Sequence, residues 1–261
     1  MSDSLSIKGL STGYRRHPVI SEMSLEAIPR GKVTVLLGPN GCGKSTLLRA
    51  LAGLNRAEGE IWLDNKDINH LSLAERGDKV VYLPQSLPSG VHLQVLESVL
   101  VSARATGQQG ADVSPERILQ LLDEVGIASL ALRYMDELSG GQKQMVGLAQ
   151  SLVRNPSLLL LDEPLSALDL NYQYHVMSLV SKETRARNMV TVVVLHDINI
   201  ALRHSDHVVM MKSGRIVASG APADVITPES LAEVYGVRGR IELCSQGVPQ
   251  VHIDGLVSGN L

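Results

Sequence analysis

One glycine-rich segment has the residue types and the spacing of a phosphate-binding loop. The run Gly38-Pro39-Asn40-Gly41-Cys42-Gly43-Lys44-Ser45 matches the pattern G-x-x-x-x-G-K-[ST] in full, follows an apolar run and opens an amphipathic helix. Glycines let backbone N–H groups turn around a phosphate, and a helix N-terminus adds positive potential. Lys44 would bind the β- and γ-phosphates, and the Ser45 hydroxyl would ligate Mg²⁺. An ordinary glycine-rich turn is the alternative, and the flanking elements favour phosphate binding.

A pair of carboxylates follows a second apolar run. Asp162 and Glu163 come directly after Leu158–Leu161. A buried strand that ends at Asp162 would place this carboxylate at the sheet edge where the phosphates lie, within reach of Mg²⁺. Glu163 would point differently and could polarise an attacking water. A capping pair before Pro164 is the alternative, and the phosphate loop makes the catalytic interpretation the better one.

The sequence pattern around these groups predicts an α/β fold with a mostly parallel core sheet. Continuous apolar runs predict buried parallel strands, and Leu47, Leu48, Leu51 and Leu54 would share one face of the helix after Lys44. The runs that predict strands are Lys32–Leu37, Lys79–Leu83, Leu158–Leu161, Val190–Leu195 and Val208–Met211.

Three segments depart from a simple strand–helix alternation. About 75 residues separate Leu83 from Leu158, where one crossover helix needs roughly 30, so a helical subdomain is inserted there. A helix is expected from Pro115, after the cap Ser114, to a stop at Gly126, and residues 106–112 are expected to form a loop. The ranges 5–28 and 60–63 favour antiparallel strands, and the tail favours a small hairpin around residues 247–249.

The composition excludes several classes of function. The chain has 261 residues, 44% apolar and 20% charged, with a net charge of −3. This balance is typical of a soluble globular domain and argues against a nucleic-acid binder, which needs a basic surface. Two cysteines and no Phe argue against a disulfide framework and against a stacking platform for bases. No signal peptide and no run of about 20 apolar residues is present, so any work at a membrane would be done from its side.

With these residues in view, the chain resembles the ATP-binding cassette (ABC) ATPases, a P-loop NTPase family, from Leu5 to about Gly236. Its specific mark is Leu138-Ser139-Gly140-Gly141-Gln142, which is identical to the family's signature sequence. The resemblance implies that Gln85 senses Mg²⁺ and the γ-phosphate, that Asp169 belongs to the D-loop, that His196 is the switch histidine and that Tyr14 stacks on adenine. Taken singly, Tyr14 would more often be a surface tyrosine than a stacking residue, and His196 could be a strand-end histidine with its hydrogen bonds satisfied.

The resemblance also implies a set of site residues and a division of the chain. The catalytic group is Glu163 with His196 and Gln85, and the metal ligands are Ser45, Gln85 and Asp162. The nucleotide contacts are Tyr14, Gly38, Pro39, Asn40, Gly41, Cys42, Gly43, Lys44, Ser45, Thr46, Ser139, Gly140, Gly141, Gln142 and Asp169. An ATPase domain would span residues 1–240, with the helical subdomain at about 86–155 and a short tail at 241–261.

The family arrangement implies the partners. Two copies would pack head to tail with each ATP between the phosphate loop of one and the signature of the other, giving a homodimer. ATP is the substrate and Mg²⁺ the cofactor. Separate permeases, and indirectly a periplasmic or lipoprotein substrate-binding protein, would place the chain peripherally on the cytoplasmic face of the inner membrane.

The stretches 142–150, 195–199, 205–207 and 213–222 look like those of iron-chelate importers, which carry siderophores, haem or vitamin B12. A non-transport ABC ATPase is the other class that we weigh.

Two residue types leave smaller questions. The thiol of Cys42 lies near inward-pointing N–H groups and could be acidified, or it could be a small residue that merely fits. The eight histidines have no metal-ligand spacing, and His204 and His207 are expected to be surface residues.

Overall fold

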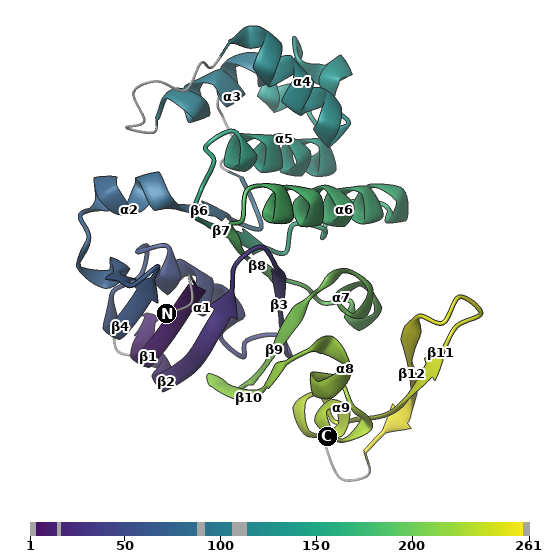
Figure 1. Ribbon diagram of the computed structural model, residues 1–261. Helices are drawn as coiled ribbons and strands as arrows, with labels where there is room; N and C mark the ends of the chain where they lie inside the picture. The colour runs from purple at the N-terminus through teal and green to yellow at the C-terminus, as the bar shows by residue number, and fades with distance from the viewer. Residues whose placement is uncertain (1–3, 15–16, 88–91, 106–113, 258–261) are drawn as a thin grey trace.

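The computed structural model describes residues 4–14, 17–87, 92–105 and 114–257 (Figure 1). Its central element is a six-stranded sheet in the order β10-β9-β3-β8-β7-β6, in which only β10 runs antiparallel to its neighbour. The strands are β3 (Val33–Leu37), β6 (Val80–Leu83), β7 (Leu158–Asp162), β8 (Val190–Val194), β9 (His207–Lys212) and β10 (Arg215–Gly220). The five apolar runs of the sequence therefore form the parallel strands, as predicted.

A second, antiparallel sheet covers one face of the first. Its order is β2-β1-β4-β5, with β1 (Ser4–Tyr14), β2 (His17–Pro29), β4 (Ala57–Leu63) and β5 (Lys66–Asp67). Helix α1 (Lys44–Leu51) packs into the core between the two sheets through its buried leucines. The antiparallel strands expected near the N-terminus are confirmed.

Alternate residues of the buried strands enter two different cores. On β7, Leu158 and Leu160 face the core shared with the antiparallel sheet, whereas Leu159 and Leu161 face the helices on the other side. Successive side chains on a strand point to opposite faces, so a strand covered on both faces must be apolar throughout. This is why these strands lack an alternating pattern in the sequence.

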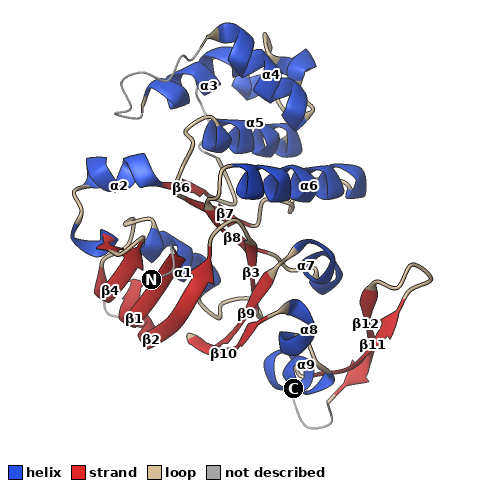
Figure 2. Ribbon diagram, in the orientation of Figure 1, coloured by secondary structure: helices blue, strands red, loops and turns tan. Residues whose placement is uncertain are grey.

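Helices α3 (Val95–Arg104), α4 (Pro115–Val125) and α5 (Gly140–Leu152) lie between β6 and β7 in the chain and pack on one another at one end of the molecule (Figure 2). The side chain of Ser114 accepts the Arg117 N–H, and Gly126 ends α4 at φ 84°, as expected. The long helix α6 (Leu170–Ala186) contacts α4. The predicted loop at 106–112 lies outside the described residues.

The chain after β8 builds the opposite end of the molecule. It contains α7 (Ile198–His204), α8 (Pro222–Val225) and α9 (Pro228–Tyr235) and ends in the antiparallel pair β11 (Val237–Leu243) and β12 (Pro249–Leu256). The hairpin in the tail is confirmed, and β11 spans the predicted boundary at residue 240. No helix in the described parts of the chain has the length and apolar character to span a bilayer. The short helix α2 (Leu73–Lys79) and three 3₁₀ turns complete the described elements.

One expectation for α1 is wrong. Leu54 was expected on the apolar face of the helix, but α1 ends at Leu51 and the side chain of Leu54 is 57% exposed. The buried guanidinium of Arg76 donates to the last carbonyls of the helix, at 2.8 Å from Ala50 O and 2.7 Å from Leu51 O. Gly53 then turns the chain at φ 76°. The Gly53 N–H donates to Ala50 O at 3.0 Å and the Leu54 N–H to Arg49 O at 2.8 Å, so the helix ends at a local glycine stop. Arg76 from α2 supplies an additional donor to the last carbonyls.

Candidate active site

The phosphate loop connects the end of β3 to the start of α1. Gly38, Gly41 and Gly43 have φ values of 150°, 75° and 106°. A residue with a side chain would be strained in these backbone conformations. A Cβ on Gly38 would lie 2.2 Å from the carbonyl oxygen of Met211, so the loop also needs glycine for close approach to β9. Gly43 caps α1 without a side-chain hydrogen bond, which leaves the N–H groups of the first turn directed into the loop.

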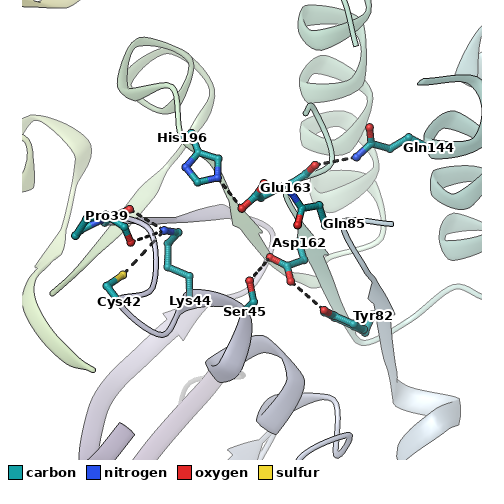
Figure 3. A network of polar contacts seen from close by, with 11 residues as sticks. Pro39, Cys42, Lys44, Ser45, Tyr82, Gln85, Gln144, Asp162, Glu163 and His196 are labelled. Carbon is teal, nitrogen blue, oxygen red and sulfur yellow. Dashed lines mark hydrogen bonds and ion pairs between the residues drawn. The ribbon is translucent and has the colours of Figure 1, made fainter. Parts of the chain in front are cut away.

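Lys44 lies folded over this loop. Its Nζ donates to the carbonyl oxygens of Gly38 at 2.7 Å and Pro39 at 3.0 Å, and the side chain is only 5% exposed (Figure 3). An ammonium held by two carbonyls beside a helix N-terminus is placed to bind a phosphate oxygen as a point charge.

Oxygen ligands suited to a divalent cation meet at the start of α1. Ser45 Oγ donates to Asp162 Oδ1 at 2.9 Å, although the two residues come from α1 and from the end of β7. Asp162 is 3% exposed, and burial raises the pKa of its carboxyl while hydrogen bonds from Ser45 and Tyr82 oppose that rise. A hydroxyl and a carboxylate at this distance fit Mg²⁺, which prefers oxygen ligands and keeps waters or phosphate oxygens in the rest of its shell.

The candidate base Glu163 is held by two neighbouring strand ends. Its Oε1 lies 2.6 Å from His196 Nε2, and its Oε2 accepts from Gln85 Nε2 at 2.6 Å (Figure 3). Gln85, Glu163 and His196 follow β6, β7 and β8, which are adjacent and parallel, so their side chains gather at one sheet edge. Glu163 adopts φ 51°, an uncommon backbone conformation that neighbouring groups must hold.

One of these neighbouring groups is Gln144 on α5. Its Nε2 donates to the Glu163 carbonyl at 2.8 Å, and its Oε1 accepts from the Ala167 N–H at 3.3 Å. The side chain is 6% exposed. A single amide thus connects the helix that begins at the signature to the backbone of the candidate base.

An open cleft of about 500 Å³ brings most of the predicted residues together. It is lined by Tyr14, Val19, Asn40, Gly41, Gly43, Lys44, Ser45, Thr46, Gln85, Glu163 and His196. Tyr14 is 47% exposed, so its ring can offer a face to a planar base. The cleft brings together the candidate phosphate loop, the candidate metal ligand Ser45, the candidate base Glu163 and the ring of Tyr14, a combination that suits a nucleoside triphosphate.

The signature residues lie elsewhere. Ser139 caps α5 by accepting the Gln142 N–H, and a separate pocket of about 270 Å³ is lined by Ser139, Gly141, Gln142 and Asp169 together with neighbouring residues. A Cβ on Gly141 would lie 2.6 Å from Ala167 O, so glycine is also required here for packing. Gly140 borders a further groove with Gln85. In the described part of the chain the signature and the phosphate loop thus line two different cavities.

The environment of Cys42 bears on the two interpretations of its thiol. The thiol is 3% exposed, and burial raises its pKa more than the nearby Lys44 lowers it. This favours the second interpretation, a small buried residue that fits the loop.

The two histidines expected at the surface are only partly exposed. His204 and His207 are half-buried, and burial lowers the pKa of both. Among the described residues no three His, Cys, Asp or Glu side chains form a metal-binding group.

Three residues of the site were not predicted from the sequence. Val19 lines the cleft, Tyr82 donates to Asp162 Oδ2 at 2.9 Å, and Gln144 supports Glu163. Val19 and Tyr82 lie in strands, where an apolar or aromatic residue looks like core. Gln144 carried no signal either, because a glutamine on a helix is usually exposed and only the packing around α5 buries this one.

Comparisons with known proteins agree with this site. A family model described as ABC transporter matches residues 20–166. The chain is 36% identical to the ferric enterobactin transport ATP-binding protein FepC of Escherichia coli, over 88% of this chain and 86% of that protein. It is 39% identical to the hemin import ATP-binding protein HmuV of Hahella chejuensis, over 81% and 84%. A solved inward-facing transporter of metal-chelate type covers 98% of both chains at a TM-score of 0.79 and 26% identity.

The phosphate loop, the paired carboxylates and the signature lie in the matched length of chain. The protein belongs to the ABC transporter family and is an ATP-binding, ATP-hydrolysing subunit of that family.

Proposed function

We propose that the protein hydrolyses ATP to power import of a ferric siderophore or a related iron chelate through separate permease subunits. The observation that carries this proposal is the likeness, over most of the chain, to ATP-binding proteins of ferric enterobactin, iron(3+)-hydroxamate and achromobactin transport. The 39% identity to a hemin import protein favours haem as the second candidate cargo.

The cleft residues divide the work of hydrolysis. Lys44 and the N–H groups at the start of α1 bind the β- and γ-phosphates, and Tyr14 stacks on the adenine. Ser45, Asp162 and Gln85 hold Mg²⁺, which neutralises phosphate charge when bound. Glu163 orients the attacking water and accepts its proton, and His196 donates to a γ-phosphate oxygen. Because His196 Nε2 lies 2.6 Å from Glu163 Oε1, His196 leaves this contact when the same nitrogen donates to a phosphate oxygen.

We further propose that two copies form a head-to-tail dimer around ATP. The signature and Asp169 border a pocket separate from the phosphate cleft, so one chain cannot use both on one nucleotide. A two-fold arrangement lets each copy supply its signature to the other's cleft. Loss of the γ-phosphate then removes a contact shared by the two copies, and the helical subdomain moves with it.

The remaining parts of the proposal concern the setting of the protein. The chain works at the cytoplasmic face of the membrane, bound to permeases that receive cargo from a substrate-binding protein. The ATPase domain spans residues 1–240 with its helical subdomain at about 86–155, and residues 241–261 form the tail.

Uptake of radiolabelled ferric siderophore tests the proposal. Cells lacking the gene receive the wild type, Glu163→Gln, or Glu26→Gln as a control at an exposed strand position, and immunoblots verify equal amounts. We expect wild type and Glu26→Gln to restore uptake and Glu163→Gln to fail. Unchanged siderophore uptake without the gene, combined with lost uptake of labelled haemin, would transfer the assignment to haem. If neither uptake changes, the iron-chelate proposal is wrong.

A further inference from the structure

Tyr82 and the metal-ligand candidate Asp162 face each other from neighbouring strands. Tyr82 on β6 is the register partner of Leu160 on β7, and Asp162 lies two residues beyond Leu160 on the same strand face. Since β6 and β7 are parallel, both side chains point toward α1 and the phosphate loop. The backbone pairing, rather than a flexible loop, brings the phenol to the carboxylate.

The contact is a direct hydrogen bond to one defined oxygen. Tyr82 donates its hydroxyl proton to Asp162 Oδ2 at 2.9 Å, while Ser45 Oγ donates to Oδ1 at 2.9 Å (Figure 3). Each carboxylate oxygen thus has its own donor. A carboxylate oxygen can only accept, so the hydroxyl of Tyr82 is the donor in this contact.

Packing alone does not require this hydroxyl. The ring of Tyr82 packs half-buried against the core between the two sheets, where a phenylalanine ring would serve equally well. What the hydroxyl adds is a permanent donor to a carboxylate that is 3% exposed and has little water to orient it. Ser45 cannot serve in this way, because its own oxygen is a proposed metal ligand.

We propose that Tyr82 is a positioning residue for the metal site: its hydroxyl holds Asp162 by Oδ2, so that Oδ1 faces the cation beside Ser45. This role rests on the Mg²⁺ site proposed above. Outer partners of metal ligands orient them, and their loss weakens metal affinity about 10- to 100-fold. Tyr82 therefore acts on metal affinity and leaves metal-free nucleotide binding unchanged.

The test measures metal binding directly. Purified full-length chain is saturated with ADP, and Mn²⁺ binding is followed by electron paramagnetic resonance for wild type and Tyr82→Phe. A parallel titration measures ADP affinity in EDTA. Tyr174→Phe is the matched control, since Tyr174 lies on α6 and stacks edge-on against His204, away from the cleft. We expect Tyr82→Phe to weaken Mn²⁺ binding about 10-fold or more, with ADP affinity in EDTA and the melting temperature close to wild type.

A double-mutant cycle isolates the route of the effect. In an Asp162→Asn background, Tyr82→Phe is expected to cause no further loss of Mn²⁺ affinity. Equal Mn²⁺ affinity of wild type and Tyr82→Phe would overturn the positioning role while leaving the metal site intact. The same loss in both backgrounds would also overturn it, because Tyr82 would then act independently of Asp162. Absence of Mn²⁺ binding by the wild type would overturn the metal site itself and the role of Tyr82 with it.

Discussion

Replacement of Gln144 by leucine tests whether the signature helix holds the catalytic base in place. The leucine side chain has a similar size but offers neither the donor to the Glu163 carbonyl at 2.8 Å nor the acceptor for the Ala167 N–H at 3.3 Å. The Glu163 carbonyl and the Ala167 N–H would then both lack their hydrogen-bond partner. The segment between them, in which Glu163 adopts φ 51°, would lose the side-chain amide that links its two ends.

The expected magnitudes follow from these two contacts. A buried polar group left unpaired costs about 1–3 kcal/mol, and water can reach the partly exposed ends, so the free energy of unfolding should fall by about 2 kcal/mol. For a chain of this size that lowers the melting temperature by about 4–8 °C. A base displaced by about 1 Å can lose on the order of 10²-fold in rate, so kcat should fall roughly 10- to 100-fold. KM for ATP should stay within about threefold, because Gln144 does not touch the phosphate loop.

The assay is steady-state ATP hydrolysis at a temperature well below the melting transition, with thermal unfolding measured on the same samples. Gln150→Leu, further along α5, is the matched control and should retain wild-type kcat. A wild-type kcat for Gln144→Leu would refute the reasoning, since the base would then need no support from α5. A rise in KM at unchanged kcat would refute it as well, because the lost contact would then serve binding.

Three further changes test other parts of the structure. Glu163→Gln should retain ATP binding, lower hydrolysis by about 10²–10⁴-fold and give an ATP-dependent dimer by size-exclusion chromatography; hydrolysis at the wild-type rate would remove Glu163 from its role. Arg76→Met should lower the free energy of unfolding by about 2–4 kcal/mol in denaturant melts, because the last carbonyls of α1 lose a charged donor. Arg76 is only 5% exposed, so water cannot easily replace it. An unchanged denaturation midpoint would contradict a stabilising role for this hydrogen bond. Burial, with a smaller effect of Lys32, lowers the pKa of His207, so the folded form takes up its proton at a lower pH than the unfolded chain, in which the imidazole titrates near pH 6.5. Stability should thus fall on acidification through that range, and less steeply in His207→Gln; equal slopes for the two proteins would contradict the assignment.

The strands and the phosphate loop could be predicted because they depend on short-range rules. A strand covered on both faces needs an apolar run, and a loop that wraps a phosphate needs glycine, lysine and a hydroxyl at set spacing. The helix from Pro115 to Val125 followed from its cap and its glycine stop. The end of α1 also has a local stop in Gly53, at φ 76°, although the spacing of the leucines alone suggested a longer helix. The additional donor to its last carbonyls, Arg76, could not be predicted in this way, because it lies in α2.

The burial of individual side chains could not be predicted from the sequence either. The position of Cys42 suggested a thiol among N–H groups, but the core around it excludes water and raises its pKa. The two histidines expected at the surface are half-buried for the same reason. Burial is the outcome of every element packed around a residue, and a local pattern contains only one of them.

By itself the sequence determined that the protein has a phosphate loop, a carboxylate pair and a signature, because each of these is a short stretch whose chemistry depends on neighbouring residues. The tertiary structure decided how they meet. It aligned the ends of β6, β7 and β8, so that Gln85, Glu163 and His196 touch. It also paired Tyr82 with Asp162 and placed the signature at a separate pocket. The physical reason is that the register between strands and the packing of α5 are set by contacts between residues far apart in the chain.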